Sequence, residues 1–419
     1  MGKVKIFFRK VPRAKIYLSL GTLTTTLFKV LFTKLKKGET TAELEKKLSE
    51  HFGVKNVIML PRARMAMFYL LKSLNLPKDS EVIMTPLTIA DMVNAVRWAG
   101  LNPVFCDLGE NTYNIDCRKL TGLITPKTKI LFVTHLTGLA SDMDEIMKIA
   151  QNYNLIFVED ASQSFNGKFN GKFLGTFGTA GIFSLSFLKT CSTLFGGVLV
   201  MNDSVLAGKI RRESEKLPPP PKILLIKEIL KNIILAVVTN RIIFSLKTYY
   251  FIKLSGAVNS NMVNKFIKSN PKPSLTDAPP QKYLYSYTDA QAEIGLKMLD
   301  ATFEMDKKRI TNANFLIDNL SDKAKSKLPA ILKNTKNTFW RLPIQTDEPE
   351  KFRRYLFKNY VDSASTNLIL ASEEPSFKKY ASPALVARLA HKAIFIPIHP
   401  AFSEEDLLYV AKLINNYFQ

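Results

Sequence analysis

Short apolar runs alternate with amphipathic stretches through residues 82–203 of the chain. The apolar runs are rich in β-branched and aromatic residues: VIMTP, PVFCDL, KILFVTHL, LIFVEDAS, AGIFSLSF and GGVLVMND. Between several of them lie amphipathic segments such as 89–100 and 142–154, which have the pattern of helices. Nearly continuous apolar strands separated by helices are typical of a parallel sheet that is covered on both faces. The pattern therefore predicts an α/β fold with a mostly parallel central sheet.

Two proline-rich segments interrupt this pattern, LPPPPK at 217–222 and NPKPSLTDAPPQK at 270–282. Because proline favours extended, non-helical connections, we expect the apolar segment between them to project from the body as a unit. Residues 288–310 then have the pattern of a long helix, and the chain ends in a helical pattern that Ser403 can cap. The predicted domains are a basic amphipathic N-terminal segment (1–37), a large domain (38–215), a basic hydrophobic insertion (216–282), and a return helix with a small C-terminal α+β domain (283–419).

The net charge of +23 is concentrated in the two apolar segments on either side of the large domain. Residues 1–37 hold ten Lys or Arg and no acidic residue, and residues 216–273 hold ten Lys or Arg and one acidic residue, Glu228. Within 222–254 the longest uncharged stretch runs only from 232 to 240, well short of the ~20 apolar residues that span a bilayer. Lysines that recur among Ile, Leu and Phe are typical of helices that lie in the interface of an anionic membrane.

These segments therefore predict an anionic membrane surface as a partner. Two alternatives remain for the insertion: an ordinary buried helical hairpin with lysines at its edges, or a hairpin that packs against the second subunit of a dimer. Nucleic acid is not expected as a partner, because phosphate-binding surfaces rarely place so much Ile and Leu among the charges.

Cysteines and histidines are few and scattered: Cys106, Cys117, Cys191, His51, His135, His391 and His399. They form no CxxC pair and no spacing typical of metal ligands, so neither a disulfide framework nor a metal site is indicated. No small-residue cleavage site of a signal peptide follows the N-terminal segment. We therefore expect a reduced, cytoplasmic location, with the protein peripheral at the inner face of the membrane.

The candidate chemistry lies where apolar runs end. Lys189 follows AGIFSLSF, precedes a cluster of Thr, Ser and Gly, and has no acidic residue within a dozen positions. It either reaches solvent at a strand end or serves a site with Asp160, which ends LIFVED, and Ser184. Ligands of such sheets bind at the carboxyl ends of the strands. A pyridoxal phosphate site needs a lysine for the Schiff base, a carboxylate to keep the pyridine nitrogen protonated, and small donors for the phosphate.

The block from 157 to 203, FVEDASQSFNGKFNGKFLGTFGTAGIFSLSFLKTCSTLFGGVLVMND, resembles the central motif of the DegT/StrS-type sugar aminotransferases, pyridoxal phosphate enzymes of fold type I. The similarity extends over most of the chain, through EVIMTPLT, ITPKTKILFVTHLTG and ALVARLAHKAIFIPIHP. It implies that Lys189 forms the Schiff base and shuttles a proton, and that Asp160 contacts the pyridine nitrogen. It further implies that Gln163 lies near the phenolic oxygen of the cofactor and that Ser184 binds its phosphate.

Three positions depart from the pattern of the family. Where the family has Ser-Gly-Thr at its first phosphate-binding helix, this chain has PRARMA, so the backbone amides of Ala63 and Arg64 are expected to bind the phosphate, with the Arg64 guanidinium adding charge. Ile89 replaces the aromatic residue that stacks on the ring. Leu284 and Ser286 replace the Asn and Arg that precede the long helix, where the Asn of the family reaches the phosphate of a neighbouring subunit.

The resemblance implies a homodimeric aminotransferase that moves an amino group, from glutamate as donor, onto a keto-sugar linked to a nucleotide or a lipid. The basic segments place this reaction at a membrane surface, in cell-envelope or glycan biosynthesis. The alternative, which rests on the three departures, is a catalytically degenerate family member that acts as a membrane-bound scaffold. The intact lysine, aspartate, glutamine and serine favour catalysis, because a scaffold does not need them.

Overall fold

The computed structural model describes residues 10–255 and 273–419. Predictions made for 1–9 and 256–272, which belong to the two basic segments, lie outside the described residues.

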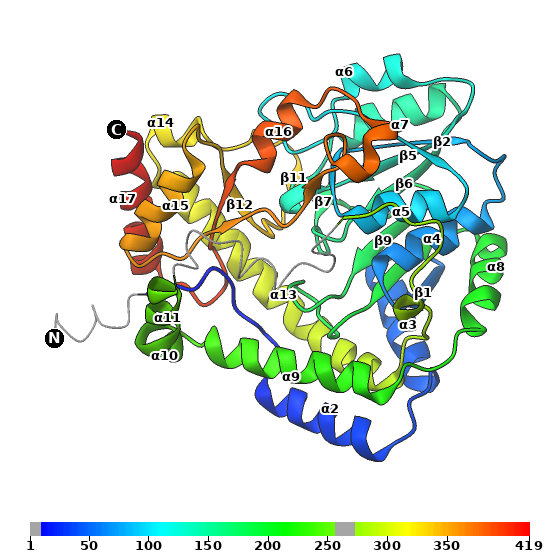
Figure 1. Ribbon diagram of the computed structural model, residues 1–419, viewed down its shortest axis with the longest axis horizontal. Helices are drawn as coiled ribbons and strands as arrows, with labels where there is room; N and C mark the ends of the chain where they lie inside the picture. The colour runs from blue at the N-terminus through cyan, green and yellow to red at the C-terminus, as the bar shows by residue number, and fades with distance from the viewer. Residues whose placement is uncertain (1–9, 256–272) are drawn as a thin grey trace.

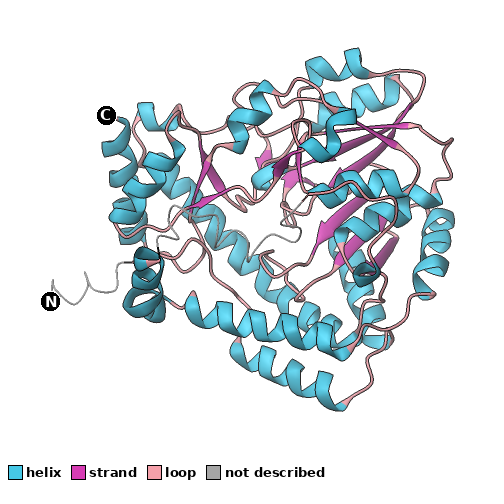
Figure 2. Ribbon diagram, in the orientation of Figure 1, coloured by secondary structure: helices cyan, strands magenta, loops and turns pink. Residues whose placement is uncertain are grey.

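A seven-stranded sheet forms the centre of the large domain, with helices on both faces (Figure 1, Figure 2). Its strands in spatial order are β1 (Asn56–Leu60), β10 (Gly197–Met201), β9 (Ala180–Ser184), β6 (Ile156–Asp160), β5 (Thr128–Thr134), β2 (Glu81–Met84) and β4 (Asn102–Phe105). All of them run parallel except β10, which is antiparallel to its neighbours β1 and β9. The predicted α/β fold with a mostly parallel sheet is confirmed.

Helices cover both faces of this sheet, which explains why the strands are apolar along nearly their whole length. The helices that share a core with one face are α4 (Ala63–Ser73), α5 (Ala90–Trp98) and α8 (Ser204–Glu215). Those that share a core with the other face are α3 (Glu39–Phe52), α7 (Met143–Asn152) and α13 (Asp289–Asp318). Apolar residues of both cores are almost fully buried, as expected for strands without a solvent-facing side.

The strand register brings the candidate site residues to one edge. The pairing of β5 with β6 places Thr134 beside Asp160, and the pairing of β6 with β9 places Asp160 beside Ile182. Ser184 ends β9 two residues further on. The carboxyl ends of these parallel strands therefore lie together, as the sequence predicted.

The small C-terminal domain contains a three-stranded antiparallel sheet of β12 (Leu342–Ile344), β15 (Ile394–Ile396) and β13 (Ala364–Ser365). Its helices are α14 (Asp322–Lys325), α15 (Pro349–Lys358), α16 (Leu385–His391) and α17 (Glu404–Phe418).

The long helix α13, predicted from the sequence, joins the domains: Ile294 lies in the core of the large domain and Leu316 in that of the small one. Ser403 caps α17 as predicted, in a reciprocal capping box with Asp406.

Besides four short 3-10 helices, η1 (Thr121–Leu123), η2 (Leu136–Gly138), η4 (Gln281–Tyr283) and η5 (Pro375–Tyr380), several other short elements lie in the described chain. They are α6 (Cys117–Leu120), β3 (Leu87–Thr88) paired with β14 (Ile369–Leu370), and β7 (Lys168–Phe169) between β8 (Lys172–Phe173) and β11 (Thr335–Lys336). The pairs β3 with β14 and β7 with β11 join segments of the large domain to segments that follow α13.

The hydrophobic insertion lies along the body and does not project from it. It forms α9 (Lys222–Val238), α10 (Arg241–Ile243), a π-helical turn η3 (Phe244–Thr248) and α11 (Tyr249–Leu254). α9 lies beside α2 (Leu20–Phe32) of the N-terminal segment (Figure 1). α11 packs on the small domain, where the Tyr249 and Phe357 rings stack with centroids 4.5 Å apart. The expectation of a projecting unit is wrong because these helices bury one face, with Leu225 and Ile229 of α9 fully inaccessible.

Within the described ranges, no single helix is long and apolar enough to cross a bilayer. α9 and the segment Arg241–Leu254, bent by 63° where they meet, reach that length and composition only together. At this bend Arg241 pairs with Asp406 of α17, with 2.6 Å between nitrogen and oxygen, which ties the insertion to the small domain.

Candidate active site

The site residues named from the sequence all line one cavity of ≈ 390 Å³ at the carboxyl edge of the sheet. Two lie at strand ends (Asp160 and Ser184), two in the loops that follow these strands (Gln163 and Lys189), and three at the starts of helices α4 and α5 (Ala63, Arg64 and Ile89). The sheet topology therefore brings together groups that are far apart along the chain.

Lys189 lines this cavity and is only partly accessible to solvent. Its Nζ lies 3.8 Å from the centroid of the Trp340 ring. Burial lowers the pKa of Lys189 to about 7; the carboxylate of Asp160 opposes this shift, and the positive charge of Arg341 adds to it. An amine with this pKa is partly neutral at physiological pH, so it can act as a nucleophile and as a proton carrier.

Asp160 and its neighbours are held by backbone hydrogen bonds. The buried Asp160 carboxylate accepts a hydrogen bond from the amide of Ser162 at 3.0 Å. The side-chain oxygen of Gln163 accepts one from the amide of Thr137 at 2.8 Å. The hydroxyl of Ser184 lies 3.4 Å from the hydroxyl of a neighbouring serine, a long contact that leaves it available to a ligand.

The start of α4 differs in one respect from the expectation. The Arg64 guanidinium donates to the carboxylate of Asp91 and, at 2.9 Å, to the hydroxyl of Tyr283, so its charge is already paired inside the protein. This corrects the expectation that Arg64 adds charge toward a phosphate. Arg62 lines the cavity instead, with its guanidinium 4.7 Å from the centroid of the Phe195 ring. The motif PRARMA could have indicated Arg62 as the residue at the site, because Arg62 immediately precedes the first residue of the helix.

Gly197 of β10 allows the start of α4 to approach the sheet. A Cβ at this position would lie 2.3 Å from the carbonyl carbon of Arg62 and 2.5 Å from the backbone nitrogen of Ala63, closer than any real contact. No side chain among the described residues caps α4, so the amides of its first turn remain for an anion.

An aromatic side chain from the small domain lies at Lys189. Trp340 donates its indole N–H to the carbonyl of Leu188 at 2.9 Å, which fixes the ring beside the lysine. Ile89 lies in the cavity wall as an aliphatic residue. The segment FWRLPIQT, which contains Trp340, was predicted to belong to the small domain but not to the site, because its pattern does not indicate a contact with Lys189.

The insertion also forms part of the cavity wall, which sequence analysis missed. Leu224, Glu228 and Lys231 of α9 line it, although they lie between the two proline-rich segments in a region with no site motif. α9, which belongs to the segment predicted from the sequence to lie at a membrane surface, therefore borders the site directly.

The groups in this cavity fit pyridoxal phosphate. The pyridine nitrogen of this cofactor needs a carboxylate, its aldehyde carbon needs a neutral amine, and its phosphate needs amide, hydroxyl and cationic donors. Asp160, Lys189, Ser184 and Arg62 supply these groups around one cavity, together with the start of α4.

A mostly parallel sheet with a lysine and a carboxylate at its carboxyl edge, followed by a small α+β domain, defines the fold of the pyridoxal-phosphate-dependent transferases of fold type I. The sequence profile of the DegT/DnrJ/EryC1/StrS aminotransferase family matches residues 25–217 and 256–415. The chain belongs to this family, as the resemblance indicated. The match leaves out residues 1–24, 218–255 and 416–419, and the second of these ranges carries α9 to α11.

Individual relatives agree with this assignment. The chain is 36% identical over 177 residues to the spore coat polysaccharide biosynthesis protein SpsC of Bacillus subtilis (strain 168), which is 42% of this chain and 46%, or about half, of that protein. It is 24% identical over 388 residues to the GDP-perosamine synthase of Escherichia coli O157:H7, 91% of each chain.

Solved structures show the same fold. An aminotransferase from Psychrobacter cryohalolentis has a TM-score of 0.75 at 20% identity, covering 97% of this chain and 99% of the other. Helicobacter pylori PseC, an aminotransferase involved in the biosynthesis of pseudoaminic acid, has a TM-score of 0.74 at 19% identity, covering 98% and 99%.

Proposed function

We propose that this protein is a pyridoxal-phosphate-dependent aminotransferase that transfers an amino group to the keto group of a sugar. The observation that carries the proposal is the amine of Lys189, with a pKa of about 7, in one cavity with the buried carboxylate of Asp160. Relatives named GDP-perosamine synthase and dTDP-4-amino-4,6-dideoxy-D-glucose transaminase support a sugar as the acceptor.

Each residue of the cavity has a task in this reaction. When bound, pyridoxal phosphate supplies an electron sink that allows a C–H bond at the amino carbon to break. Asp160 would hold its ring nitrogen protonated, and Ser184, Arg62 and the first amides of α4 would hold its phosphate. Lys189 would accept the proton from the amino carbon of the donor and, in the second half of the reaction, deliver a proton to the keto carbon of the acceptor, because a pKa of about 7 gives Nζ both protonation states near neutral pH.

The substrates of the proposed reaction are L-glutamate as donor and a nucleotide- or lipid-linked keto-sugar as acceptor. Purified protein loaded with pyridoxal phosphate is expected to release one 2-oxoglutarate per site from glutamate even without a sugar, because the donor half of the reaction needs no acceptor. Mass spectrometry measures this product, and candidate keto-sugars are then tested for repeated turnover. Failure to release 2-oxoglutarate or another oxo-acid from any amino acid donor would support the scaffold alternative.

We further propose that the protein works as a homodimer at an anionic membrane surface, at the inner face of the membrane. More than half of the large hydrophobic side chains that are exposed in the described ranges lie on α2 and on α9 to α11. They are Leu20, Phe28, Leu31, Phe32, Ile223, Leu230, Ile234, Val237, Ile242, Leu246, Tyr250, Phe251 and Leu254. Apolar side chains in this number among lysines support binding to a lipid interface. Because α9 also borders the cavity, a lipid-linked substrate is favoured.

Replacing Phe28, Phe32 and Phe251 together by serine is expected to weaken binding to anionic vesicles by about 100-fold, because each ring is exposed and available to the interface. Flotation with phosphatidylglycerol vesicles measures this loss. The matched control replaces Leu385 and Leu389, two exposed leucines on α16, and should leave flotation unchanged. Substitution is preferable to deletion of 222–254, because deletion removes part of the cavity wall.

The oligomeric state is measured on the same variants. If the triple substitution separates the dimer but leaves flotation unchanged, the exposed face of α2 and α11 is a subunit contact and the membrane proposal is wrong.

A further inference from the structure

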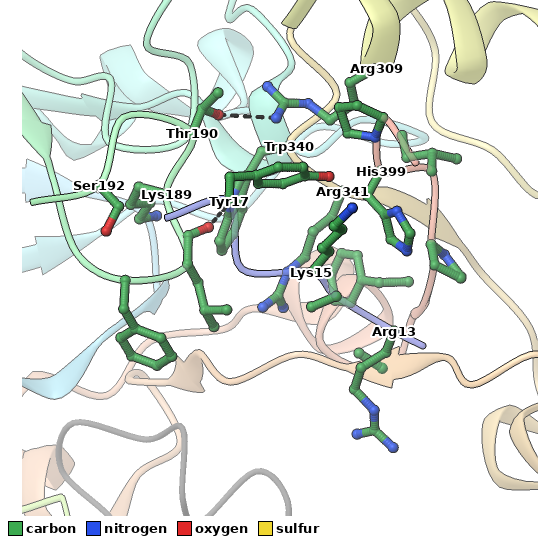
Figure 3. Close-up of a pocket in the computed structure, with 18 of the residues that line it drawn as sticks. Arg13, Lys15, Tyr17, Lys189, Thr190, Ser192, Arg309, Trp340, Arg341 and His399 are labelled. Atoms are coloured by element: carbon green, nitrogen blue, oxygen red, sulfur yellow. Dashed lines mark hydrogen bonds between the residues drawn. The ribbon is translucent and has the colours of Figure 1, made fainter. Parts of the chain in front are cut away.

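A second cavity of ≈ 110 Å³ lies on the other side of Lys189 and Trp340, which line both cavities. Figure 3 shows it crossed by the N-terminal segment that carries Arg13, Lys15 and Tyr17. This segment precedes the residues that match the family profile, so the second cavity is partly built from a part of the chain outside that match. The remaining wall comes from the small domain, from Arg309 of α13 and from the loop that contains Lys189.

Two of the cations around this cavity are already paired with carboxylates. Arg13, which points away from Lys189 in Figure 3, binds Asp362 through two nitrogens at 2.7 and 2.8 Å. Arg309 forms an ion pair with Asp306 and also donates to Thr190 at 3.0 Å. These two arginines are therefore structural.

Two other cations have no carboxylate partner among the described residues. Arg341 lies over the rings of Trp340 and Phe395, at 4.3 and 5.2 Å from their centroids, and its guanidinium has one long hydrogen bond, 3.4 Å, to Asn367. Burial lowers the pKa of Arg341 to about 10, so it stays charged at neutral pH. Lys15 is exposed at the outer part of the same cavity. The cavity thus carries one unpaired positive charge near Lys189 and a second one nearer to solvent.

Buried hydroxyls without partners lie in the same wall. The hydroxyls of Tyr17 and Ser192 are shielded from solvent and form no hydrogen bond within the described part of the chain, and Ser192 is only 3% exposed. Burying a hydroxyl without a hydrogen-bond partner is unfavourable, so such groups usually face a ligand or an ordered water. His399 adds no charge, because burial lowers its pKa to about 4. The cavity therefore offers hydrogen-bond donors and positive charge without a negative one to balance them.

We propose that this cavity binds the carboxylates of a dicarboxylic amino donor, with the α-carboxylate on Arg341, the distal carboxylate on Lys15, and the hydroxyls of Tyr17 and Ser192 as further donors. This inference rests on the proposed aminotransferase function. Guanidinium and ammonium groups at different depths match the two charged ends of one acyclic molecule. The small volume suits such a donor better than a nucleotide, for which the larger cavity across Lys189 has room.

The test uses unreactive probes, so it does not depend on turnover. Isothermal titration calorimetry of the cofactor-loaded protein compares glutarate, which has two carboxylates, with butyrate, which has one. Arg341→Gln is expected to weaken the binding of both probes by about 10- to 100-fold, the usual effect of losing a charge-assisted hydrogen bond. Lys15→Met is expected to weaken the binding of glutarate by about tenfold and to leave the binding of butyrate unchanged. The reason is that only glutarate is long enough to reach the outer cation, Lys15.

Matched variants control for folding and for general charge. Arg97→Gln removes a partly buried arginine that binds the Leu101 carbonyl far from this cavity, and Lys55→Met removes an exposed lysine elsewhere. Both should keep wild-type affinity for glutarate.

Three outcomes would overturn the inference. One is glutarate affinity that does not change in Arg341→Gln. Another is an equal effect of Lys15→Met on glutarate and butyrate. The third is binding of inorganic pyrophosphate that depends on Arg341 while glutarate does not bind, which would assign the cavity to the phosphates of the sugar carrier. Release of 2-oxoglutarate from glutamate together with any of these results would leave the proposed function intact, so the two failures are distinguishable.

Discussion

Replacing Lys189 by alanine is expected to reduce amino transfer by about 10⁴-fold, since in the proposed reaction this residue supplies both the nucleophilic amine and the proton carrier. Lys189 lines the cavity together with Asp160, whose carboxylate opposes the lowering of the Lys189 pKa by burial. The variant should still fold, because the lysine occupies a cavity and its backbone amide, which donates to the Ser186 carbonyl, is retained.

The same residue is identified chemically. Wild-type protein with pyridoxal phosphate is expected to absorb in the visible region, and borohydride reduction is expected to attach the cofactor to the peptide that contains Lys189. Lys231→Ala is the matched control: this lysine lines the same cavity, 4.1 Å from the Phe187 ring centroid, and its loss should leave the attachment unchanged. A label on another lysine would refute the assignment, and protein that gains no absorbance with the cofactor would refute the catalytic proposal.

The central sheet and three of the candidate site residues, Asp160, Ser184 and Lys189, could be predicted because local patterns determine where they lie. A strand buried on both faces has to be apolar along its length, so the runs that became β5, β6, β9 and β10 are visible without any tertiary information. Asp160 and Ser184 each end one of these strands. Because the two strands pair in parallel, their carboxyl ends lie at the same edge of the sheet. Lys189 follows Ser184 within a few residues and therefore lies near the same edge, whereas Gln163 was named only through the family resemblance.

Residues that reach the site from other parts of the chain could not be predicted in this way. Trp340 contacts Lys189 although about 150 positions separate them in the sequence, and Tyr17 lines the second cavity from the N-terminal segment. The local hydrophobic pattern does not indicate contacts between residues so far apart in the sequence. The Arg64 prediction failed for a related reason: the sequence does not show that Asp91 and Tyr283 pair with its guanidinium.

The insertion shows a different limit of sequence patterns. α9 is apolar on more than one face: Leu225 and Ile229 are buried, whereas Ile223 and Ile234 are 55% and 61% exposed. A buried hairpin and a membrane-surface helix each account for one of these faces, so the sequence alone could not decide between them. In the structure, the buried face of α9 packs on the body of the protein. The exposed face is the one that we propose contacts the membrane.

Asp160→Asn is expected to reduce turnover by about 10²- to 10³-fold while cofactor affinity changes far less. An amide has no charge with which to keep a pyridine nitrogen protonated, so the electron sink is weakened. The donors that would hold the phosphate, Ser184, Arg62 and the first turn of α4, are untouched by the substitution. Turnover is measured as 2-oxoglutarate release, and affinity by titration of the visible absorbance with pyridoxal phosphate.

The pKa of Lys189 gives this prediction a second, independent measurement. Asp160 favours the charged ammonium, so its loss should move the pKa of Lys189 below about 7, and the reductive methylation of cofactor-free protein should then begin at lower pH. Arg341→Gln is the matched variant of opposite sign, because Arg341 disfavours the ammonium and its loss should raise that pKa. If the two substitutions moved the methylation profile of Lys189 in the same direction, or if Asp160→Asn kept wild-type turnover, the assignment of Asp160 would be wrong.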